Sequence, residues 1–139
     1  MTQVYLDTGG LIALNDRSDR NHAAASAFFR RATKEGSRFV LGRPVLIEYL
    51  DGVTKRVGKR DALLRLQQIE TSSVWRVEPD TEEDHTKARE LFLQYDDQTI
   101  DMTDSLSFAI MERLDLREAF SFDPDFEIHG FARVPATKA

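Results

Sequence analysis

The sequence predicts an α/β fold with a mainly parallel central sheet. Short apolar segments of strand type alternate with longer segments whose apolar residues recur at helical spacing, and two of the short segments, residues 4–6 and 119–122, end abruptly in an aspartate. With 139 residues, 41% of them apolar and 31% charged, the chain is long enough to bury one core of its own. No repeat or linker divides it, so we expect a single domain covering residues 1–139.

The first half of the chain predicts two strands and four helices. Alanines and Phe28-Phe29 recur at helical spacing before Gly36, which is a suitable helix stop. Pro44 favours a helix start, because its missing N–H needs no partner in the first turn. In chain order we expect a strand at 4–6, a short apolar helix at 11–14, a helix at 22–34, a strand at 38–41, a helix from 44 to about 58 and a helix at 61–69.

The second half predicts three strands and two helices. Asp80 or Thr81 is expected to cap the first of these helices and Thr103 the second, because side-chain oxygens at such positions accept hydrogen bonds from the free N–H groups of the first turn. In chain order we expect a strand at 73–77, a helix ending near residue 95, a helix at 104–114, a strand at 119–122 and a short strand at 131–134.

Charge is unevenly distributed along the chain. Residues 1–70 contain 12 Lys or Arg and 8 Asp or Glu, a net charge of +4, whereas residues 71–139 contain 7 and 16, a net charge of −9; the whole chain carries −5. A basic half suits phosphates and an acidic half suits metal ions, although solvated helix faces give the same pattern. There is no cysteine, membrane-span-length apolar stretch or secretory pattern, so we expect a cytoplasmic protein without disulfides or membrane contact.

Four carboxylates stand out by their positions. Asp7 and Asp123 follow strands, and in an open parallel sheet the carboxyl ends of the strands form the ligand-binding edge. Glu48 lies within the apolar stretch 45–50, where an unpaired buried charge is costly and needs a partner. Asp104 begins an apolar helix, a position that the helix dipole alone also explains.

Carboxylates brought together repel one another unless a cation neutralises them, and oxygen ligands favour Mg²⁺ or Mn²⁺. A zinc site is disfavoured, since there is no cysteine and the histidines (His22, His85 and His129) are scattered. One or two hard cations in such a site can bind a phosphodiester, activate water and stabilise the leaving oxygen.

Four segments in order resemble the PIN-domain nucleases, which include the toxins of VapBC-type toxin–antitoxin pairs. They are YLDTGGLIAL at 5–14, RPVLIEYL at 43–50, MTDSLSFAIM at 102–111 and AFSFDPDFEIHGF at 119–131. The resemblance implies three layers, with helices flanking the parallel sheet, and Mg²⁺- or Mn²⁺-dependent cleavage of RNA. It places the metal-binding and catalytic residues at Asp7, Glu48, Asp104 and Asp123, with supporting hydroxyls at Thr8 and Ser121.

The chain departs from the family pattern at Gly9-Gly10, where a small polar residue is common. Asp101 and Asp125 are additional carboxylates beside the matched ones. We interpret Asp101 as a loop carboxylate and Asp125 as a turn or helix start after Pro124, with contact to a metal through water as the alternative.

The resemblance also implies an antitoxin partner and a homodimer formed through apolar helix faces. The candidates for phosphate contacts are basic residues near Glu48: Arg43, Lys55, Arg56, Lys59 and Arg60. Trp75 is interpreted as a core residue and not as a base-stacking platform. The phenylalanines at helical positions are interpreted as core or interface residues: Phe28, Phe29, Phe92 and Phe108. One alternative is a catalytically inactive PIN-like RNA-binding or scaffolding protein. A magnesium-dependent phosphatase is disfavoured, because no lysine follows Lys87 except Lys138.

Overall fold

A five-stranded sheet, parallel at every pairing, forms the centre of the computed structural model, which describes residues 2–135. The spatial order of the strands is β3-β2-β1-β4-β5. Their bounds are Gln3–Leu6 (β1), Arg38–Gly42 (β2), Trp75–Glu78 (β3), Glu118–Phe120 (β4) and Ala132–Val134 (β5).

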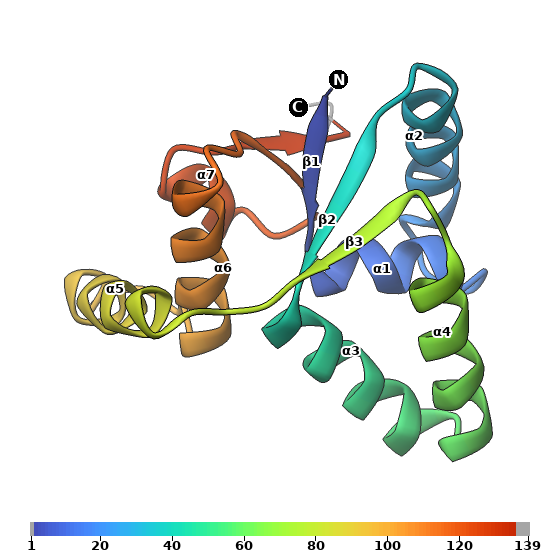
Figure 1. Ribbon diagram of the computed structural model, residues 1–139, viewed down its shortest axis with the longest axis horizontal. Helices are drawn as coiled ribbons and strands as arrows, with labels where there is room; N and C mark the ends of the chain where they lie inside the picture. Colours follow the sequence, from blue (N-terminus) through green and yellow to red (C-terminus); the bar gives the residue numbers. More distant parts are fainter. Residues whose placement is uncertain (1, 136–139) are drawn as a thin grey trace.

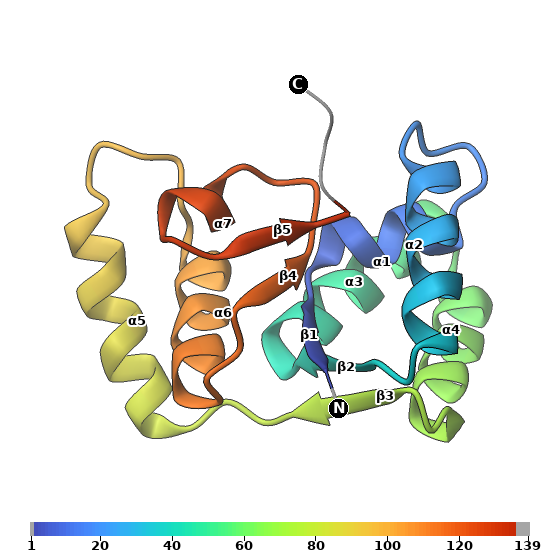
Figure 2. The same cartoon turned by 90° about the horizontal axis from the view of Figure 1, so that it is seen from above.

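Helices cover both faces of the sheet, which confirms the expected three-layer α/β/α arrangement. In Figures 1 and 2, α5, α6 and α7 lie on one side of the strands, whereas α1, α2 and α4 lie on the other. The α3 helix starts where β2 ends and runs away from the sheet (Figure 1). The helix bounds are Thr8–Asn15 (α1), His22–Lys34 (α2), Arg43–Arg56 (α3), Lys59–Thr71 (α4), Glu82–Gln94 (α5), Met102–Arg113 (α6) and Asp125–Ile128 (α7).

The order of the strands creates a crevice between β1 and β4. From β1 the chain moves outward through β2 to β3, then returns to the other side of β1 to form β4 and β5. Ligands of open α/β sheets bind at such a switch point, beside the carboxyl ends of the strands. The residues that follow β1 and β4 therefore face the same crevice.

Apolar side chains of the inner strands fill the core. Leu6, Phe39 and Phe120 are fully buried, as expected for strands covered by helices on both faces. Trp75 is half-buried and stacks on Phe29 at a ring-centroid distance of 5.2 Å, which confirms its prediction as a core residue. Phe28 and Phe108 also pack into the core, whereas Phe92 on α5 is 44% exposed and is not a core residue.

Several predicted boundaries were wrong by two residues or more, and three of them lie at the carboxyl end of the sheet. The α1 helix begins at Thr8 rather than at 11. The α6 helix begins at Met102 rather than at 104, and its cap is Asp101, not Thr103. The carboxylate of Asp101 accepts a hydrogen bond from the Asp104 N–H (2.8 Å), and that of Asp104 accepts one from the Asp101 N–H (3.3 Å), so the two carboxylates cap the helix reciprocally. The β4 strand ends at Phe120 instead of 122.

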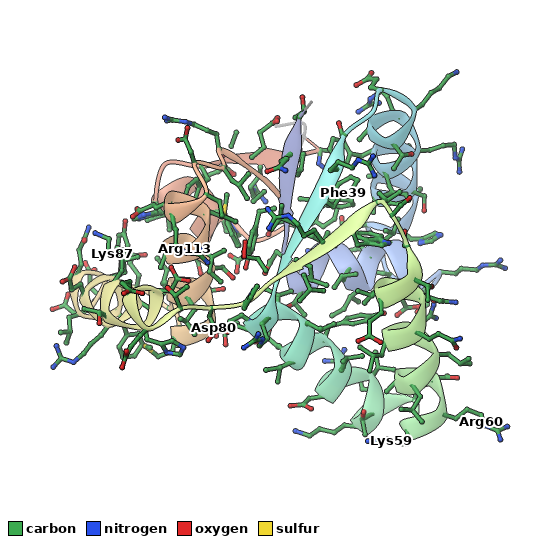
Figure 3. The ribbon with its side chains drawn as sticks, in the orientation of Figure 1. Phe39, Lys59, Arg60, Asp80, Lys87 and Arg113 are labelled. Atoms are coloured by element: carbon green, nitrogen blue, oxygen red, sulfur yellow. The ribbon has the colours of Figure 1, made fainter. Side chains whose placement is uncertain are left out.

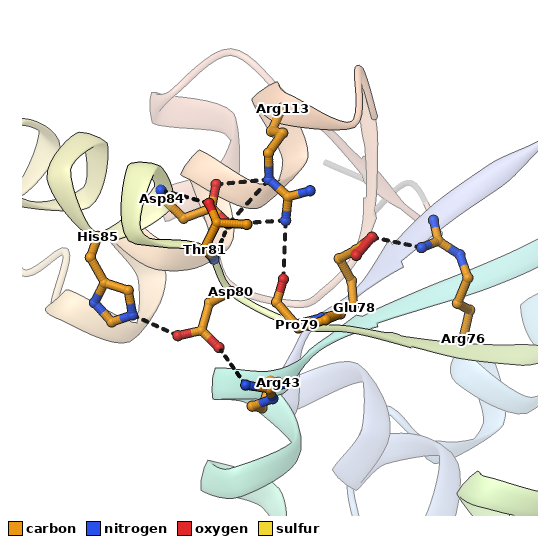
Figure 4. Close-up of polar contacts among 9 residues, drawn as sticks. All are labelled: Arg43, Arg76, Glu78, Pro79, Asp80, Thr81, Asp84, His85 and Arg113. Atoms are coloured by element: carbon orange, nitrogen blue, oxygen red, sulfur yellow. Dashed lines mark hydrogen bonds and ion pairs between the residues drawn. The ribbon is translucent and has the colours of Figure 1, made fainter.

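An ion pair ties α5 to α6 on the side of the sheet away from α1 (Figures 2 and 4). The Arg113 guanidinium donates to both carboxylate oxygens of Asp84, with its shortest contact at 2.9 Å, and also to the Pro79 carbonyl. Burial opposes ionisation of Asp84, but the hydrogen bonds from Arg113 and Thr81 outweigh it and hold the Asp84 pKa below its ordinary value. In the part of the chain that the structure describes, no helix is long and apolar enough to cross a bilayer.

Candidate functional site

A cleft of about 1200 Å³ opens at the carboxyl end of the sheet. The ends of β1 and β4, the start of α6 and one face of α3 contribute to its walls. We call the part nearest the sheet the acidic end; its carboxylates are Asp7, Glu48, Asp101, Asp104, Asp123 and Asp125. The four predicted site residues therefore share one cleft with the two further aspartates, although they come from four separate segments of the chain.

Asp7 is the most deeply placed of these carboxylates and is 8% exposed. Burial raises its pKa to about 6, and the charges of Asp123 and Glu48 act in the same direction. A hydrogen bond from Ser121 and one from the Thr8 backbone oppose the rise in its pKa. The position directly after β1 forces Asp7 into this crevice, because its N–H continues the β1–β4 ladder by donating to the Phe120 carbonyl at 3.1 Å.

Ser121 organises the turn that follows β4. Its fully buried hydroxyl donates to Oδ2 of Asp7 (2.9 Å) and accepts from the Asp123 N–H (3.0 Å). The Asp125 N–H then donates to Oδ1 of Asp123 at 2.9 Å. Because β4 ends at Phe120, Asp123 lies on this hydrogen-bonded turn and not directly at the strand end, which corrects the predicted position. The expected contact between the Ser121 hydroxyl and a carboxylate is present.

The environment of Glu48 differs from the one that the sequence predicted. Val45 and Tyr49 form the buried face of α3, whereas Ile47 and Glu48 are exposed. The apolar stretch around Glu48 is therefore not buried as a whole, and this carboxylate has no desolvation cost that demands a partner. The Thr8 hydroxyl nevertheless donates to its Oε1 at 2.6 Å, which links the start of α1 to α3 across the cleft.

Asp104, Asp123 and Asp125 form the tightest acidic group among the described residues, with one carboxylate oxygen from each within 4.8 Å of the others. Burial, followed by the charge of Asp101, raises the pKa of Asp104 to about 8. Burial and the neighbouring Asp123 also raise the Asp125 pKa. Asp125 does begin a helix, as interpreted, but its side chain joins the acidic group as well. The spacing Asp-Pro-Asp in a turn after a strand is the sequence signal that could have placed it there.

These side chains fit a hard divalent cation. Burial and the neighbouring negative charges both raise the pKa values of Asp7 and Asp104, and a cation between the carboxylates would relieve their repulsion. The donors are all oxygens, and no histidine is among the described residues that line the cleft. Oxygen-only ligand sets are typical of Mg²⁺ and Mn²⁺ and not of zinc.

The three histidines make contacts elsewhere. Nδ1 of His22 contacts the Ala13 carbonyl at 2.7 Å. His85 pairs with Asp80 at 2.6 Å, and His129 lies between Tyr95 and Glu112.

The five candidate phosphate-binding residues separate into two groups. Lys55 and Arg56 line the cleft, where they are joined by Arg17 and Arg65, which no sequence signal had singled out. The cleft lining does not include the other three candidates: Arg43 lies 3.8 Å from Asp80, and Lys59 and Arg60 project outward at the start of α4 (Figure 3).

Comparison with known proteins finds relatives over nearly the whole chain. Residues 4–132 match the PIN domain family. The chain is 29% identical over 133 residues to the 23S rRNA-specific endonuclease VapC20 of Mycobacterium tuberculosis, covering 94% of this chain and 97% of that protein. The crystal structure of M. tuberculosis VapC20, described as a sarcin-ricin loop cleaving toxin, matches with a TM-score of 0.82 and 27% identity over 93% of this chain and 96% of that one.

More distant structures share the fold. VapBC2 from Rickettsia felis, bound to a DNA fragment from the promoter, matches with a TM-score of 0.71 and 15% identity, covering 95% of this chain and 97% of that one. A toxin–antitoxin complex from Klebsiella pneumoniae matches with a TM-score of 0.65 and 15% identity, covering 98% and 99%.

Proposed function

Because this chain belongs to the PIN domain family, we propose that it is a Mg²⁺- or Mn²⁺-dependent endoribonuclease that hydrolyses RNA phosphodiester bonds at the acidic end of its cleft. The observation that carries the proposal is the meeting of Asp7, Glu48, Asp104 and Asp123 in one cleft. The likeness to VapC20, named as a 23S rRNA-specific endonuclease, supports RNA as the substrate.

The carboxylates have different roles in this proposal. Asp104, Asp123 and Asp125 would hold a cation, since one carboxylate oxygen from each lies within 4.8 Å of the others. When bound, the cation neutralises charge on the phosphodiester and makes bound water more acidic. Ser121 fixes the orientation of Asp7, and Thr8 fixes that of Glu48, so both carboxylates are in place to orient the attacking water or a second ion. In hydrolysis the attacking water would give up a proton as its oxygen forms a bond to phosphorus. The bond to the leaving sugar oxygen would break, and that oxygen would take up a proton.

The proposed biological role is that of the toxin in a toxin–antitoxin pair. The structural relatives include proteins described as toxin–antitoxin complexes, and VapC20 is itself described as a toxin. An antitoxin partner and a second copy of the chain both need apolar surface. Exposed apolar side chains are present on α3 and α4 (Ile47, Leu63 and Leu64) and on α5 (Phe92 and Leu93).

Cleavage of purified RNA in the presence of Mn²⁺ tests the catalytic proposal. We expect Asp7→Asn and Asp123→Asn each to lower the rate on the order of 100-fold or more, equivalent to at least about 2.7 kcal/mol of transition-state stabilisation. Asp96→Asn, an exposed carboxylate outside the cleft lining, serves as the control with unchanged activity. Equal activity of Asp7→Asn and the unsubstituted protein would contradict catalysis at the acidic end. Absence of cleavage by the unsubstituted protein would leave an inactive RNA-binding or scaffolding protein as the better description.

Metal binding can be measured separately from cleavage by thermal unfolding. Since a ligand that binds only the folded state stabilises it, Mn²⁺ at about 100 times its Kd should add about 2.7 kcal/mol to the free energy of unfolding. Asp123→Asn should lose most of this stabilisation, and Asp96→Asn should keep it. An equal effect of Mn²⁺ on both variants would contradict binding at the acidic group.

A further inference from the structure

We propose that the far end of the cleft is a subsite for phosphates that flank the scissile bond, formed by Arg17, Lys55 and Arg56. It takes the backbone of single-stranded RNA, and this choice of occupant rests on the proposed ribonuclease function. All three side chains line the same cleft as the carboxylates, and all three are exposed. We call this part of the cleft the basic end, although Asp16, Asp51 and Asp61 also line the cleft.

The α3 helix connects the two ends of the cleft. Glu48, Gly52, Lys55 and Arg56 are spaced by four, three and one residues, so they share one face of the helix, and all four line the cleft. Lys55 and Arg56 lie about 10–12 Å beyond Glu48 along the helix axis, given a rise of about 1.5 Å per residue. Cations at that distance suit phosphates next to the scissile one, which itself must approach the carboxylates.

Arg17 reaches the basic end from the connection between α1 and α2. The charge of Arg56 contributes to lowering the pKa of Asp16, the neighbour of Arg17, after the larger effect of two hydrogen bonds from Ser18. Asp16 and Arg17 line the same cleft as Lys55 and Arg56, so the α1–α2 connection and the end of α3 both contribute to this part of its wall. Phosphates passing between them would meet cations from both walls.

These three cations are free to bind a ligand, whereas the fourth basic residue of the cleft is not. Within residues 2–135, no ion pair involves Arg17, Lys55 or Arg56. Arg65, by contrast, is half-buried and donates to side-chain oxygens of Asn15 and Gln68. These hydrogen bonds hold the Arg65 side chain against the wall of the cleft. Unpaired, exposed cations that line a cleft are available to replace the counterions of a nucleic-acid backbone.

Gly52 keeps the path between the two ends open. A Cβ atom built at Gly52 would meet no atom within 4 Å, so packing does not require a glycine there. A glycine inside a helix costs about 0.5–1 kcal/mol of stability relative to alanine. In this proposal, the absence of a side chain at Gly52 leaves room for the RNA backbone to pass from Glu48 to Lys55 and Arg56.

Fluorescence anisotropy with a fluorescein-labelled single-stranded RNA of mixed sequence tests the subsite. The Asp7→Asn background prevents cleavage during the measurement. Adding Arg17→Ala and Arg56→Ala should weaken binding on the order of 10-fold and reduce the slope of log affinity against log salt by about 0.7 for each phosphate that is no longer neutralised. Lys59→Ala with Arg60→Ala removes the same formal charge outside the cleft and is the matched control, with little change in affinity or slope.

Substitutions at Gly52 separate an effect on the path from an effect on folding. Gly52→Ala and Gly52→Leu should both unfold at or above the melting temperature of the unsubstituted protein, but Gly52→Leu should bind the RNA several-fold more weakly because its side chain enters the cleft. In the cleaving protein, Arg17→Ala with Arg56→Ala should raise KM and leave kcat nearly unchanged, as expected for binding energy that is equal in the ground and transition states.

The two proposals fail in different ways. If the unsubstituted protein does not cut RNA, but its affinity for RNA still depends on Arg17 and Arg56, the ribonuclease proposal is wrong and the subsite remains. If the protein cuts RNA, but the Arg17→Ala and Arg56→Ala variant binds as tightly as the Lys59→Ala and Arg60→Ala control, the subsite is wrong. Absence of any RNA binding overturns it as well.

Discussion

The Ser121 hydroxyl donates a hydrogen bond of 2.9 Å to Oδ2 of Asp7, a residue 114 positions earlier in the chain. Both side chains are buried, and the same hydroxyl accepts from the Asp123 N–H. This one group therefore fixes the carboxylate that follows β1 and also the turn that carries Asp123 and Asp125. The Ser121 hydroxyl therefore connects the segment that follows β1 to the segment that follows β4, on the two sides of the switch point in the sheet.

We expect Ser121→Ala to lower the free energy of unfolding by about 1–3 kcal/mol, because it leaves a buried carboxylate without its side-chain donor. Ser18→Ala is the matched control: Ser18 also donates to a carboxylate, that of Asp16 at 2.6 Å, but the pair is exposed. Its removal should change stability by no more than about 0.5 kcal/mol. Equal losses for the two variants in chemical denaturation would contradict the role assigned to Ser121.

The stability of the metal-free protein should depend on Asp7 in a defined direction. Its folded-state pKa of about 6 lies above the ordinary value of 3.8, so folding favours the protonated form. The stability that this provides is fully present below about pH 3.8 and is lost as pH rises through about 6.

In the presence of a chelator, Asp7→Asn should therefore be more stable than the unsubstituted protein at pH 8, by at most about 3 kcal/mol at ~1.36 kcal/mol per pKa unit. Denaturant titrations from pH 4 to pH 8 would show the difference between the two proteins growing with pH. A difference that stays constant over this range would mean that Asp7 does not titrate there.

Gly10 explains one departure from the family pattern. A Cβ atom at Gly10 would lie 2.4 Å from the Phe120 carbonyl oxygen, so α1 can lie against β4 only without a side chain there. Gly10→Ala should lower the free energy of unfolding by roughly 1–3 kcal/mol or more, as overpacking in a core does. Gly9→Ala, whose Cβ would meet only Asp7 at 3.9 Å, is the control and should be nearly neutral or slightly stabilising. Similar melting temperatures for the two variants would contradict the close approach.

Arg113 should stabilise the protein far more than a surface arginine. Arg113→Ala leaves Asp84, whose side chain is 3% exposed, without its partner, a change that costs about 3–5 kcal/mol for a buried pair. Since the Arg113 side chain is 32% exposed, we expect the lower end of that range. Arg117→Ala removes an ion pair to Asp115 that is exposed on both sides and should cost less than about 1 kcal/mol.

The acid dependence of this ion pair has a predictable sign. The Asp84 pKa is lowered in the folded state, so its contribution to stability is present above the unfolded pKa and is lost as pH falls through the folded one. The stability gap between the unsubstituted protein and Arg113→Ala should therefore narrow when pH is lowered below about 4. A gap that stays constant in acid would show that packing, and not charge, explains the effect.

The sequence by itself determined the α/β architecture and the meeting of Asp7 and Asp123 at one edge of the sheet. Alternating strand and helix patterns predicted the parallel sheet, because the spacing of apolar residues reports which side chains share a face. The prediction that Asp7 and Asp123 meet also needed only the sequence, because residues that follow parallel strands lie at the same edge of a sheet. Local signals such as Pro44 and Thr81 placed helix starts correctly to within one residue.

Only the tertiary structure decided which neighbours the remaining residues have. Glu48 is exposed because the buried face of α3 passes through Val45 and Tyr49, and Asp125 joins Asp104 because the turn after β4 packs against the start of α6. Lys55 and Arg56 separate from Lys59 and Arg60 at Gly58, whose φ of 129° turns the chain between α3 and α4. The spacing of apolar residues within a helix or strand predicts which of its faces is buried. The distances between side chains on different elements depend on how those faces pack together, and no single segment of the sequence contains that information.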